Sequence, residues 1–381
     1  MYLWRVSGVL TLIAIEAFLY GYTYPYFSLA LEKHGLPTWL IGLNASLAGA
    51  GIFIVGPFLP ALIERIGLKT VVTGQFALSL LSFLALLLTD NMAVWFLSRF
   101  VMGTCFSTLW TTTEIWLNGV VTDRHRGRII GASGTLYATC QFLGPVVLGQ
   151  TGVVGAFPVW AAIAPLSLGV IFALIVPSAV GEAEEEDLGD IKGLKLAWTL
   201  AGSLILFGFL GGVGETALQS LLPIYGLAHG LDDANASYLV AVFSLGEAVL
   251  VAVLGWLADR WGRGETLALC TGLAVATMVA LPFSMDMIAV RTAILFIAGG
   301  AISGLYTLGV ILIGQDYRGA RLATVSTGFA MAYAAGSIIG STPIGYVIDL
   351  AGPEGLPLSI ALGFALLGVS LFRRKTVEAG N

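Results

Sequence analysis

Residues 255–263 read Gly-Trp-Leu-Ala-Asp-Arg-Trp-Gly-Arg, a short charged stretch between two long apolar ones. Residues 60–68, Pro-Ala-Leu-Ile-Glu-Arg-Ile-Gly-Leu, repeat the pattern in a weaker form 195 positions earlier. A charged turn that recurs between apolar segments is typical of membrane proteins built from two duplicated halves. The pattern therefore predicts two similar halves, each made of membrane helices.

The composition excludes an ordinary soluble protein. Hydrophobic residues make up 57% of the 381 positions and charged residues only 11%, whereas soluble domains carry roughly 25% charged residues. Residues 129–181 contain no Asp, Glu, Lys or Arg, and because about 20 apolar residues cross a bilayer core as a helix, this run is long enough for two crossings. The three cysteines lie in apolar runs at unrelated spacings and indicate core positions, not a disulfide or a metal site: Cys105, Cys140 and Cys270.

Turn residues and charges divide the chain into twelve predicted helices, so we expect an all-α membrane protein. The predicted ranges are 5–31, 38–62, 69–89, 93–120, 127–150, 156–177, 195–227, 234–257, 264–283, 288–314, 320–348 and 355–373. We expect two pseudo-symmetric six-helix bundles, residues 1–177 and 195–381, joined by a cytoplasmic linker at 178–194. Six acidic residues crowd this linker, as in a solvated loop.

The distribution of basic residues predicts the orientation. All Lys and Arg except Lys33, Arg99 and Arg291 fall in tails or loops on one side of the predicted arrangement. Because Lys and Arg concentrate on the cytoplasmic side of membrane proteins, we predict a multi-pass protein of the cytoplasmic membrane with both termini inside. Glu16 interrupts the first apolar segment and no small-residue cleavage site follows, which favours a transmembrane helix over a signal peptide.

The two halves correspond at further positions. His-Gly-Leu at 34–36 recurs at 229–231, again 195 residues apart, and Asp-Arg-His-Arg-Gly at 123–127 is echoed by Asp-Tyr-Arg-Gly at 316–319. Together with the charged turns, these landmarks occur in the same order in each half. The chain thus resembles the major facilitator superfamily of secondary transporters over essentially its whole length.

Several motifs carry this resemblance. The family signature G-x-L-A-D-R-x-G-R between helices two and three is complete at 255–263, whereas the copy at 60–68 has Pro60 for the leading Gly, Glu64 for Asp and Leu68 for the last Arg. The fourth-helix signature, an Arg followed four residues later by Gly, is matched by Arg99 and Gly103. The fifth-helix motif G-P-x-x-G-G, associated with antiporters, survives only in part at 144–149, which leaves the direction of transport open.

A narrower resemblance concerns residues 126–128, Arg-Gly-Arg, and residues 114–118, Glu-Ile-Trp-Leu-Asn, just before them. These segments are similar to a poorly characterised bacterial branch of the superfamily that is usually grouped with drug-efflux proteins. The resemblance implies export as one direction of transport.

The charged turns predict a conformational latch. An acidic residue beside a tight turn can pair with nearby Arg residues and face the N-terminus of a neighbouring helix, which would hold one conformational state and release in another. The alternative is that these turns only set the orientation. The latch candidates are Glu64, Arg65, Gly255, Asp259, Arg260, Gly262 and Arg263.

Charged residues inside apolar helices are candidates for function because inserting each costs about 2.5–3.5 kcal/mol. A carboxyl group in such a place can bind and release a proton, and the candidates for proton coupling are Glu16, Glu114, Glu215 and Glu247. Glu247 has an alternative role in a structural ion pair with Arg291. We place Glu16 first because it lies near the middle of its helix, with no basic residue within 10 positions.

Helical spacing places Arg99, Gly103, Ser107, Trp110 and Glu114 on one face of the fourth helix. We expect this stripe to line a central cavity, although a packing face would show the same spacing. The predicted cavity residues are Tyr20, Tyr24, Asn44, Arg99, Ser107, Trp110 and Gln219.

The sequence therefore favours a monomeric secondary transporter that moves a small organic molecule by alternating access, with proton-coupled efflux as the first interpretation. One alternative is an importer or facilitator of a small, anionic metabolite bound by Arg99. Another is a membrane sensor that keeps the fold without transporting. We expect its partners to be the substrate, protons and the lipid bilayer, without nucleic acid, metal or cofactor. The sequence contains no phosphate-binding Gly-Lys-Ser/Thr loop, which argues against an ATPase. It also contains no nucleophile–base pair or metal-ligand cluster, which argues against an enzyme.

Overall fold

The computed structural model describes residues 2–177 and 191–378, and within these ranges every regular element is a helix. Ten helical stretches are long and apolar enough to cross a membrane. The other two predicted segments are also helical, but α6 (Arg126–Thr151) is less hydrophobic and the apolar part of α14 is shorter, Gly355–Val369. The predicted all-α membrane fold is confirmed, with ten of the twelve expected crossings shown by length and composition.

The chain divides into two compact units, of which the first comprises Met1–Lys33 and Asn44–Glu186, and the second His34–Leu43 and Asp187–Asn381. The boundary between residues 186 and 187 lies within the predicted linker, of which residues 178–190 are outside the described ranges. The short segment His34–Leu43 belongs to the second unit. The sequence instead predicted one bundle for all of residues 1–177.

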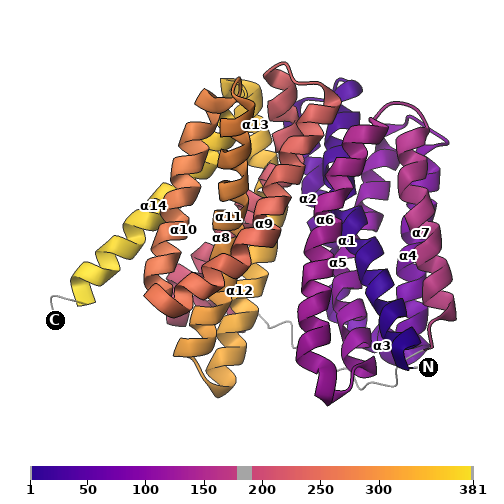
Figure 1. The fold of residues 1–381 in the computed structure, drawn as a ribbon, viewed down its shortest axis with the longest axis horizontal. Helices are drawn as coiled ribbons and strands as arrows, with labels where there is room; N and C mark the ends of the chain where they lie inside the picture. Colours follow the sequence, from indigo (N-terminus) through magenta and orange to yellow (C-terminus); the bar gives the residue numbers. More distant parts are fainter. Residues whose placement is uncertain (1, 178–190, 379–381) are drawn as a thin grey trace. The chain divides into compact units, whose positions relative to one another are not determined.

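Helices of the first unit lie side by side (Figure 1), with α1 packed against α5, α6 and α7, and α4 packed against α5 and α7. The bounds of the helices before the linker are α1 Tyr2–Lys33, α2 Thr38–Val55, η1 Gly56–Phe58, α3 Leu59–Ile66, α4 Leu68–Leu86, α5 Met92–Val120, η2 Asp123–His125, α6 Arg126–Thr151 and α7 Phe157–Ile175. The start of α2, up to Leu43, belongs to the second unit. Gly144 allows α6 to approach α1 closely, since a Cβ atom there would lie 2.4 Å from the backbone nitrogen of Tyr22. The remnant Gly-Pro motif thus contributes to packing.

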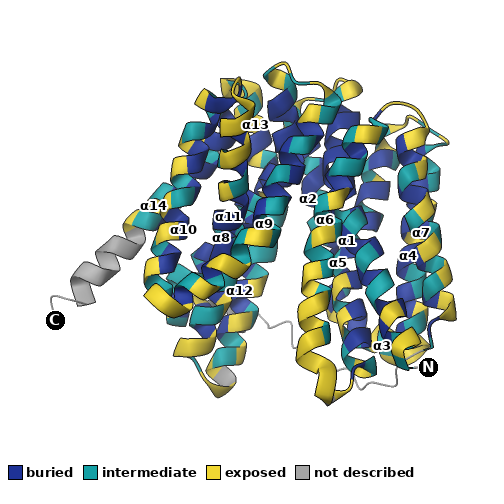
Figure 2. Ribbon diagram, in the orientation of Figure 1, coloured by how far each residue is buried: buried dark blue, intermediate teal, exposed yellow. Residues whose placement is uncertain are grey.

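In the second unit, α8 packs along α12, α9 along α11, and α10 against both α11 and α14. The bounds are α8 Ile191–Ala228, α9 Asp233–Trp261, α10 Arg263–Ala280, η3 Leu281–Ser284, α11 Ile288–Asp316, α12 Gly319–Ile339, α13 Ser341–Ala351 and α14 Gly355–Glu378. In each unit the buried residues lie mainly where helices face one another, and exposed residues lie on outward faces (Figure 2).

Several predicted helices are interrupted. The segment predicted at 38–62 becomes α2, η1 and α3, with Pro57 in the short 3-10 turn. The segment predicted at 320–348 divides into α12 and α13 around Gly340, just before Pro343. Because proline has no N–H group for the helical ladder, a break beside each proline is physically reasonable. A further interruption is a kink in α8 at Ala201, where φ is −143° and ψ is 37°.

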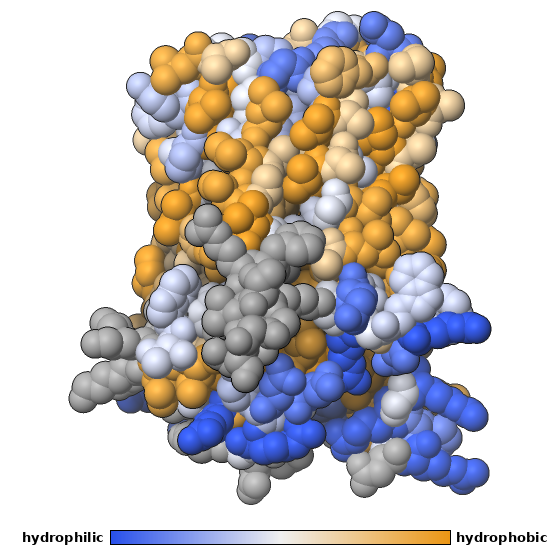
Figure 3. Space-filling model, turned by 90° about the vertical axis from the view of Figure 1, so that its left-hand side faces the viewer, coloured by the Kyte–Doolittle hydropathy of each residue, from blue (hydrophilic) through white to orange (hydrophobic). Residues whose placement is uncertain are grey.

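Surface hydropathy fits a membrane protein. On the face that carries α14, hydrophobic side chains form a broad belt above the middle, whereas hydrophilic side chains gather at the lower end and a few more lie at the top edge (Figure 3). Exposed apolar residues of the second unit include Leu269, Val279, Leu362 and Leu366. Such a continuous apolar surface is stable next to lipid hydrocarbon and would be unfavourable in water.

Candidate functional site

Glu16 lies in the middle of α1 and is only 1% exposed. The hydroxyl of Thr113, on α5, donates a hydrogen bond to Glu16 Oε2 over 3.3 Å. The same hydroxyl lies 2.8 Å from the carbonyl oxygen of Leu109. Since a hydroxyl has only one proton, it can turn to Leu109 and accept a hydrogen bond from a protonated Glu16 instead. The site is therefore compatible with both protonation states of the carboxyl group.

Arg99 of α5 is also only 1% exposed. Its guanidinium carbon lies 4.3 Å from the centre of the Tyr24 ring and 5.1 Å from that of Phe27, so two aromatic faces contact the cation. Among the described residues, its Nε and Nη2 atoms have no hydrogen-bond partner. A buried cation whose N–H groups remain unpaired is unfavourable for stability, which makes Arg99 a candidate for binding.

Asn44 of α2 has the same character, because it is 1% exposed and both polar atoms of its side chain lack partners within the described part of the chain. Gly103 packs against Ala48, and a Cβ atom at Gly103 would lie 2.2 Å from the Ala48 Cα atom. Asn44 and Arg99 each precede this contact by one turn of helix, which places them at similar heights on adjacent helices. Tyr24 packs with Ala45 and Ala48, and Tyr20 packs against this cluster.

The remaining residues of the predicted α5 stripe have different neighbours. Trp110 is 45% exposed and its ring meets that of Tyr137, on α6, edge to face at 4.6 Å. Ser107 donates to the carbonyl of Thr104. Glu114 is exposed, unlike Glu16, although the charges of these two carboxyl groups interact. The stripe thus includes both buried and accessible side chains, and its role in a cavity stays a prediction.

The second unit has its own pair of intramembrane carboxyl groups. Tyr333, on α12, donates a short hydrogen bond to Glu215 Oε2 on α8. Ser303, on α11, donates to Glu247 Oε1 on α9 over 2.8 Å. The two glutamates interact electrostatically, and both are partly buried. Four helices therefore bring two acidic groups and their hydroxyl partners together.

The structure shows other partners for Arg291 and for Glu247, and an ion pair between them stays a prediction. Arg291 donates from Nη1 to the carbonyl oxygen of Met285 over 2.7 Å, near the start of α11. Glu247 lies farther along the bundle, where Gly299 of α11 approaches its backbone nitrogen. Gln219, one turn after Glu215 on α8, is 1% exposed, and its Nε2 atom lacks a partner among the described residues.

The charged turns show local contacts within each unit. Arg263 lies 4.0 Å from Asp259 and donates to Gln315, on α11, over 2.8 Å, while Arg260 stacks over Trp256. Gly262 has a φ of +117°, a conformation that favours glycine, so it ends α9 and starts α10. Of the other latch candidates, Glu64 and Arg65 are exposed, and Gly255 has open space where a Cβ atom would lie. A latch function of these residues stays a prediction.

One clear interaction was not anticipated from the sequence. Both carboxylate oxygens of Asp349, on α13, accept hydrogen bonds at the start of α2, from the backbone N–H groups of Thr38 and Trp39, each over 2.9 Å. A second missed cluster joins Glu354 to Tyr225 and His229, each at 3.0 Å. The pairs are more than 100 residues apart in sequence, so no local pattern indicates them.

The chain matches a known protein family and several known proteins. The family model described as Major Facilitator Superfamily matches residues 9–341 and 204–381. The uncharacterized MFS-type transporter YfkF of Bacillus subtilis is 24% identical over 78% of this chain and 77% of its own length. The uncharacterized MFS-type transporter YcaD of Escherichia fergusonii is 26% identical over 81% of this chain and 80% of its own length.

Among solved structures, the chain is similar to the nucleoside transporter NupG, with a TM-score of 0.83, 12% sequence identity and coverage of 97% of this chain and 98% of NupG. At this identity the similarity shows a shared fold. The chain belongs to the major facilitator superfamily and is a multi-pass membrane transport protein. The family consists of transport proteins that are not enzymes, as expected from the sequence.

Proposed function

We propose that this protein is a proton-coupled secondary transporter of the cytoplasmic membrane that exports a small organic molecule by alternating access. The observation that carries this proposal is Glu16, a fully buried carboxyl group in the middle of α1 that accepts a hydrogen bond from the hydroxyl of Thr113. No ion pair with Glu16 is found among the described residues. A carboxyl group in this setting can exchange a proton without breaking a structural salt bridge.

The hydroxyl of Thr113 supports this role because it has two orientations. With Glu16 ionised, Thr113 donates to the carboxylate; with Glu16 protonated, the hydroxyl donates to the Leu109 carbonyl and accepts from the carboxyl group. A proton can therefore be loaded or released with only a local hydrogen-bond change. This property suits a transport cycle in which the proton crosses in one direction and the substrate in the other.

The carboxyl groups of the second unit provide a further place for a proton. Glu215 and Glu247 interact with each other and accept from Tyr333 and Ser303, respectively. Two acidic groups in one site also suit a cationic substrate, since the cation and a proton would compete for the same negative charge. We assign Glu16 to coupling first and this pair second.

The test is gradient-driven transport in proteoliposomes. A ligand is first identified with a thermal-stability screen of the purified protein against metabolites and drugs, because a ligand that binds only the folded state raises its apparent stability. Its accumulation under an imposed pH gradient is then compared for the natural protein and Glu16→Gln. We expect Glu16→Gln to abolish gradient-driven accumulation while ligand binding and exchange continue, because glutamine mimics the protonated form.

Glu32→Gln is the matched control, since it makes the same chemical change near the C-terminal end of α1. The Glu215→Gln and Glu247→Gln variants complete the series. Full gradient-driven accumulation in Glu16→Gln, Glu215→Gln and Glu247→Gln alike would refute proton coupling through the buried carboxyl groups. Ligand binding without transport by the natural protein would instead indicate a membrane sensor.

Arg99 favours a second candidate function, the import or facilitated diffusion of a small anionic metabolite. Its buried guanidinium has two unpaired nitrogen atoms and lies at the height of Asn44, which is also unpaired among the described residues. A carboxylate or phosphate group of a substrate would satisfy these donors. The two candidates are distinguished by the charge of the ligands that the protein binds.

A further inference from the structure

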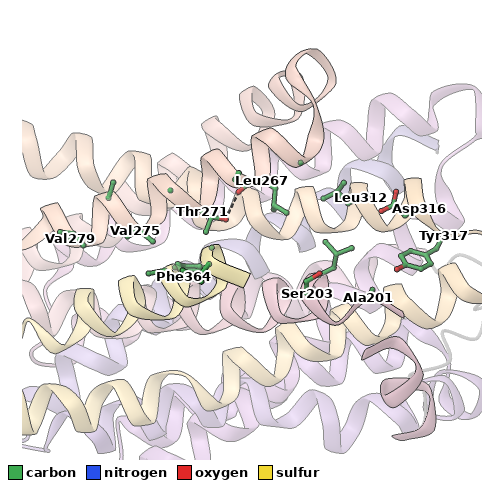
Figure 4. A pocket seen from close by; sticks show the side chains of 18 residues that line it. Ala201, Ser203, Leu267, Thr271, Val275, Val279, Leu312, Asp316, Tyr317 and Phe364 are labelled. Atoms are coloured by element: carbon green, nitrogen blue, oxygen red, sulfur yellow. Dashed lines mark hydrogen bonds between the residues drawn. The ribbon is translucent and has the colours of Figure 1, made fainter. Parts of the chain in front are cut away.

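The second unit encloses a cavity of about 780 Å³ between α8, α10, α11 and α14. Its lining is mostly apolar, with Leu267, Val275, Val279, Leu312 and Phe364 among the side chains that line it (Figure 4). Asp316 and Tyr317 lie at one end of the cavity and Val279 lies toward the other. The cavity contains none of the carboxyl groups proposed for coupling, so it is distinct from the proposed transport site.

Two polar side chains of this lining donate their hydroxyl protons to backbone carbonyl groups. Thr271 donates from its hydroxyl to the carbonyl oxygen of Leu267, one turn earlier on α10, over 2.8 Å. Tyr317 donates to the carbonyl oxygen of Leu200 over 2.7 Å, directly beside the kink at Ala201. A water molecule in a cavity needs two to four polar partners. The body of the cavity offers few, and it therefore suits an apolar occupant better than water.

The cavity opens toward the surroundings of the helix bundle along α10. Gly272, Ala276 and Val279 line the cavity and are exposed. Exposed apolar side chains, including Leu269, continue the same helix surface. In a membrane these positions meet lipid hydrocarbon, so an occupant can enter sideways from the bilayer.

The length of the cavity suits an extended occupant. The α10 lining extends from Gly264 to Val279, about 22 Å at 1.5 Å per residue. A single acyl chain is long and flexible enough to follow such a lining. Its hydrocarbon is complementary to the mostly apolar side chains along the cavity.

We propose that this cavity binds one acyl chain of a bilayer phospholipid. The chain lies along α10, with its polar headgroup at the end marked by Asp316 and Tyr317. Residues at this end carry both signs of charge, since Asp316 is acidic and two arginines flank the lining, Arg263 before Gly264 and Arg318 after Tyr317. The site thus has an apolar body and a charged mouth, which complements the two parts of a phospholipid.

Gly272 provides a specific test. A Cβ atom at this position would meet no atom within 4 Å, so a larger side chain can enter the cavity without a clash. Leucine is also a better helix former than glycine. Gly272→Leu should therefore fill the cavity while α10 stays folded. The matched control is Gly74→Leu on α4, where the space for a Cβ atom is equally open and which is not part of the cavity lining.

The experiment uses the full chain in vesicles of phosphatidylethanolamine and phosphatidylglycerol that contain a phospholipid with a photoreactive group on one acyl chain. After illumination, labelled peptides are mapped by mass spectrometry. We expect labelling to concentrate in residues 264–279 and 364–369 of the natural protein. In Gly272→Leu this labelling should fall to the level of the other helices, whereas Gly74→Leu should keep it.

Uniform labelling of all membrane helices, or unchanged labelling of α10 in Gly272→Leu, would overturn the proposal. Enrichment only with a free photoreactive fatty acid would contradict the assignment to a phospholipid. Covalent crosslinks between two copies of the chain at α10 would show that a second copy covers the cavity instead. Thermal unfolding of both leucine variants confirms that any loss of labelling comes from a folded protein.

Discussion

At the scale of single residues, three charged side chains are held in three different ways. Glu16 has a hydroxyl partner, Arg99 has aromatic faces and unpaired nitrogen atoms, and Asp349 accepts from backbone N–H groups. Only the last arrangement satisfies the charged group with two strong hydrogen bonds. The incomplete satisfaction of Arg99 is therefore the residue-level feature that most favours a ligand, because a buried unpaired donor costs about 1–3 kcal/mol.

This reasoning predicts the effect of Arg99→Gln on anion binding. Hydrogen bonds to charged groups contribute about 1.5–3 kcal/mol, so loss of the guanidinium should weaken an anionic ligand by roughly 10- to 100-fold. Isothermal titration of the purified protein with benzoate and with benzyl alcohol measures this difference. Lys33→Gln, which removes a positive charge at the end of α1, is the control. Equal affinity for both probes before and after the substitution would argue against an anion site.

At the scale of elements, the start of α2 shows how a distant residue completes a helix. The first N–H groups of a helix have no partner within it, and the residue before α2 is Pro37, whose side chain cannot accept a hydrogen bond. Asp349 accepts from the first two N–H groups and places a negative charge at the positive end of the helix dipole. Gly345 allows this contact, since a Cβ atom there would lie 2.6 Å from the Thr38 carbonyl oxygen.

Asp349→Ala should therefore loosen the first turn of α2. Loss of a capping side chain costs about 0.5–2 kcal/mol, which corresponds to roughly 2- to 30-fold faster hydrogen exchange where opening controls it. Mass-spectrometric exchange of a peptide that covers residues 38–43 provides the measurement. Asp286→Ala, in the turn before α11, removes an exposed carboxylate elsewhere and should leave this peptide unchanged. No change in Asp349→Ala would mean that packing alone fixes the helix start.

At the scale of the whole molecule, the repeated charged turns and the bias of basic residues predict both termini in the cytoplasm. The arginine-containing loops at 260–263 and 318–321 belong to one predicted side, and 34–36 and 229–231 to the other. Because the positive-inside bias includes nearly every Lys and Arg, few local changes could reverse it.

Cysteine labelling checks this orientation. In a variant without Cys105, Cys140 and Cys270, a cysteine introduced by Glu185→Cys should react with a membrane-impermeant maleimide only in inverted vesicles. His34→Cys is the matched position on the opposite side and should react in intact cells. Labelling of Glu185→Cys from outside would reverse the topology.

The sequence predicted the helices well where long apolar runs end at charges or turn residues. The segments around Glu16, Glu215 and Glu247 were expected as membrane helices, and they are helical in the structure. The breaks beside Pro57 and Pro343 were not expected, although proline gives a local reason for each. Whether a proline interrupts a helix depends on how its neighbours pack, since Pro25 lies within continuous α1.

By itself, the sequence determined the all-α membrane fold, the two-half organisation of its motifs and the membership of a transporter superfamily, because hydrophobic length and charge position act locally along the chain. Only the tertiary structure decided which polar groups meet: Thr113 with Glu16, Tyr333 with Glu215, and Asp349 with the start of α2. It also placed the Arg291 guanidinium against the carbonyl oxygen of Met285. These pairings depend on the rotation and height of each helix, which are set by close packing between segments far apart in sequence.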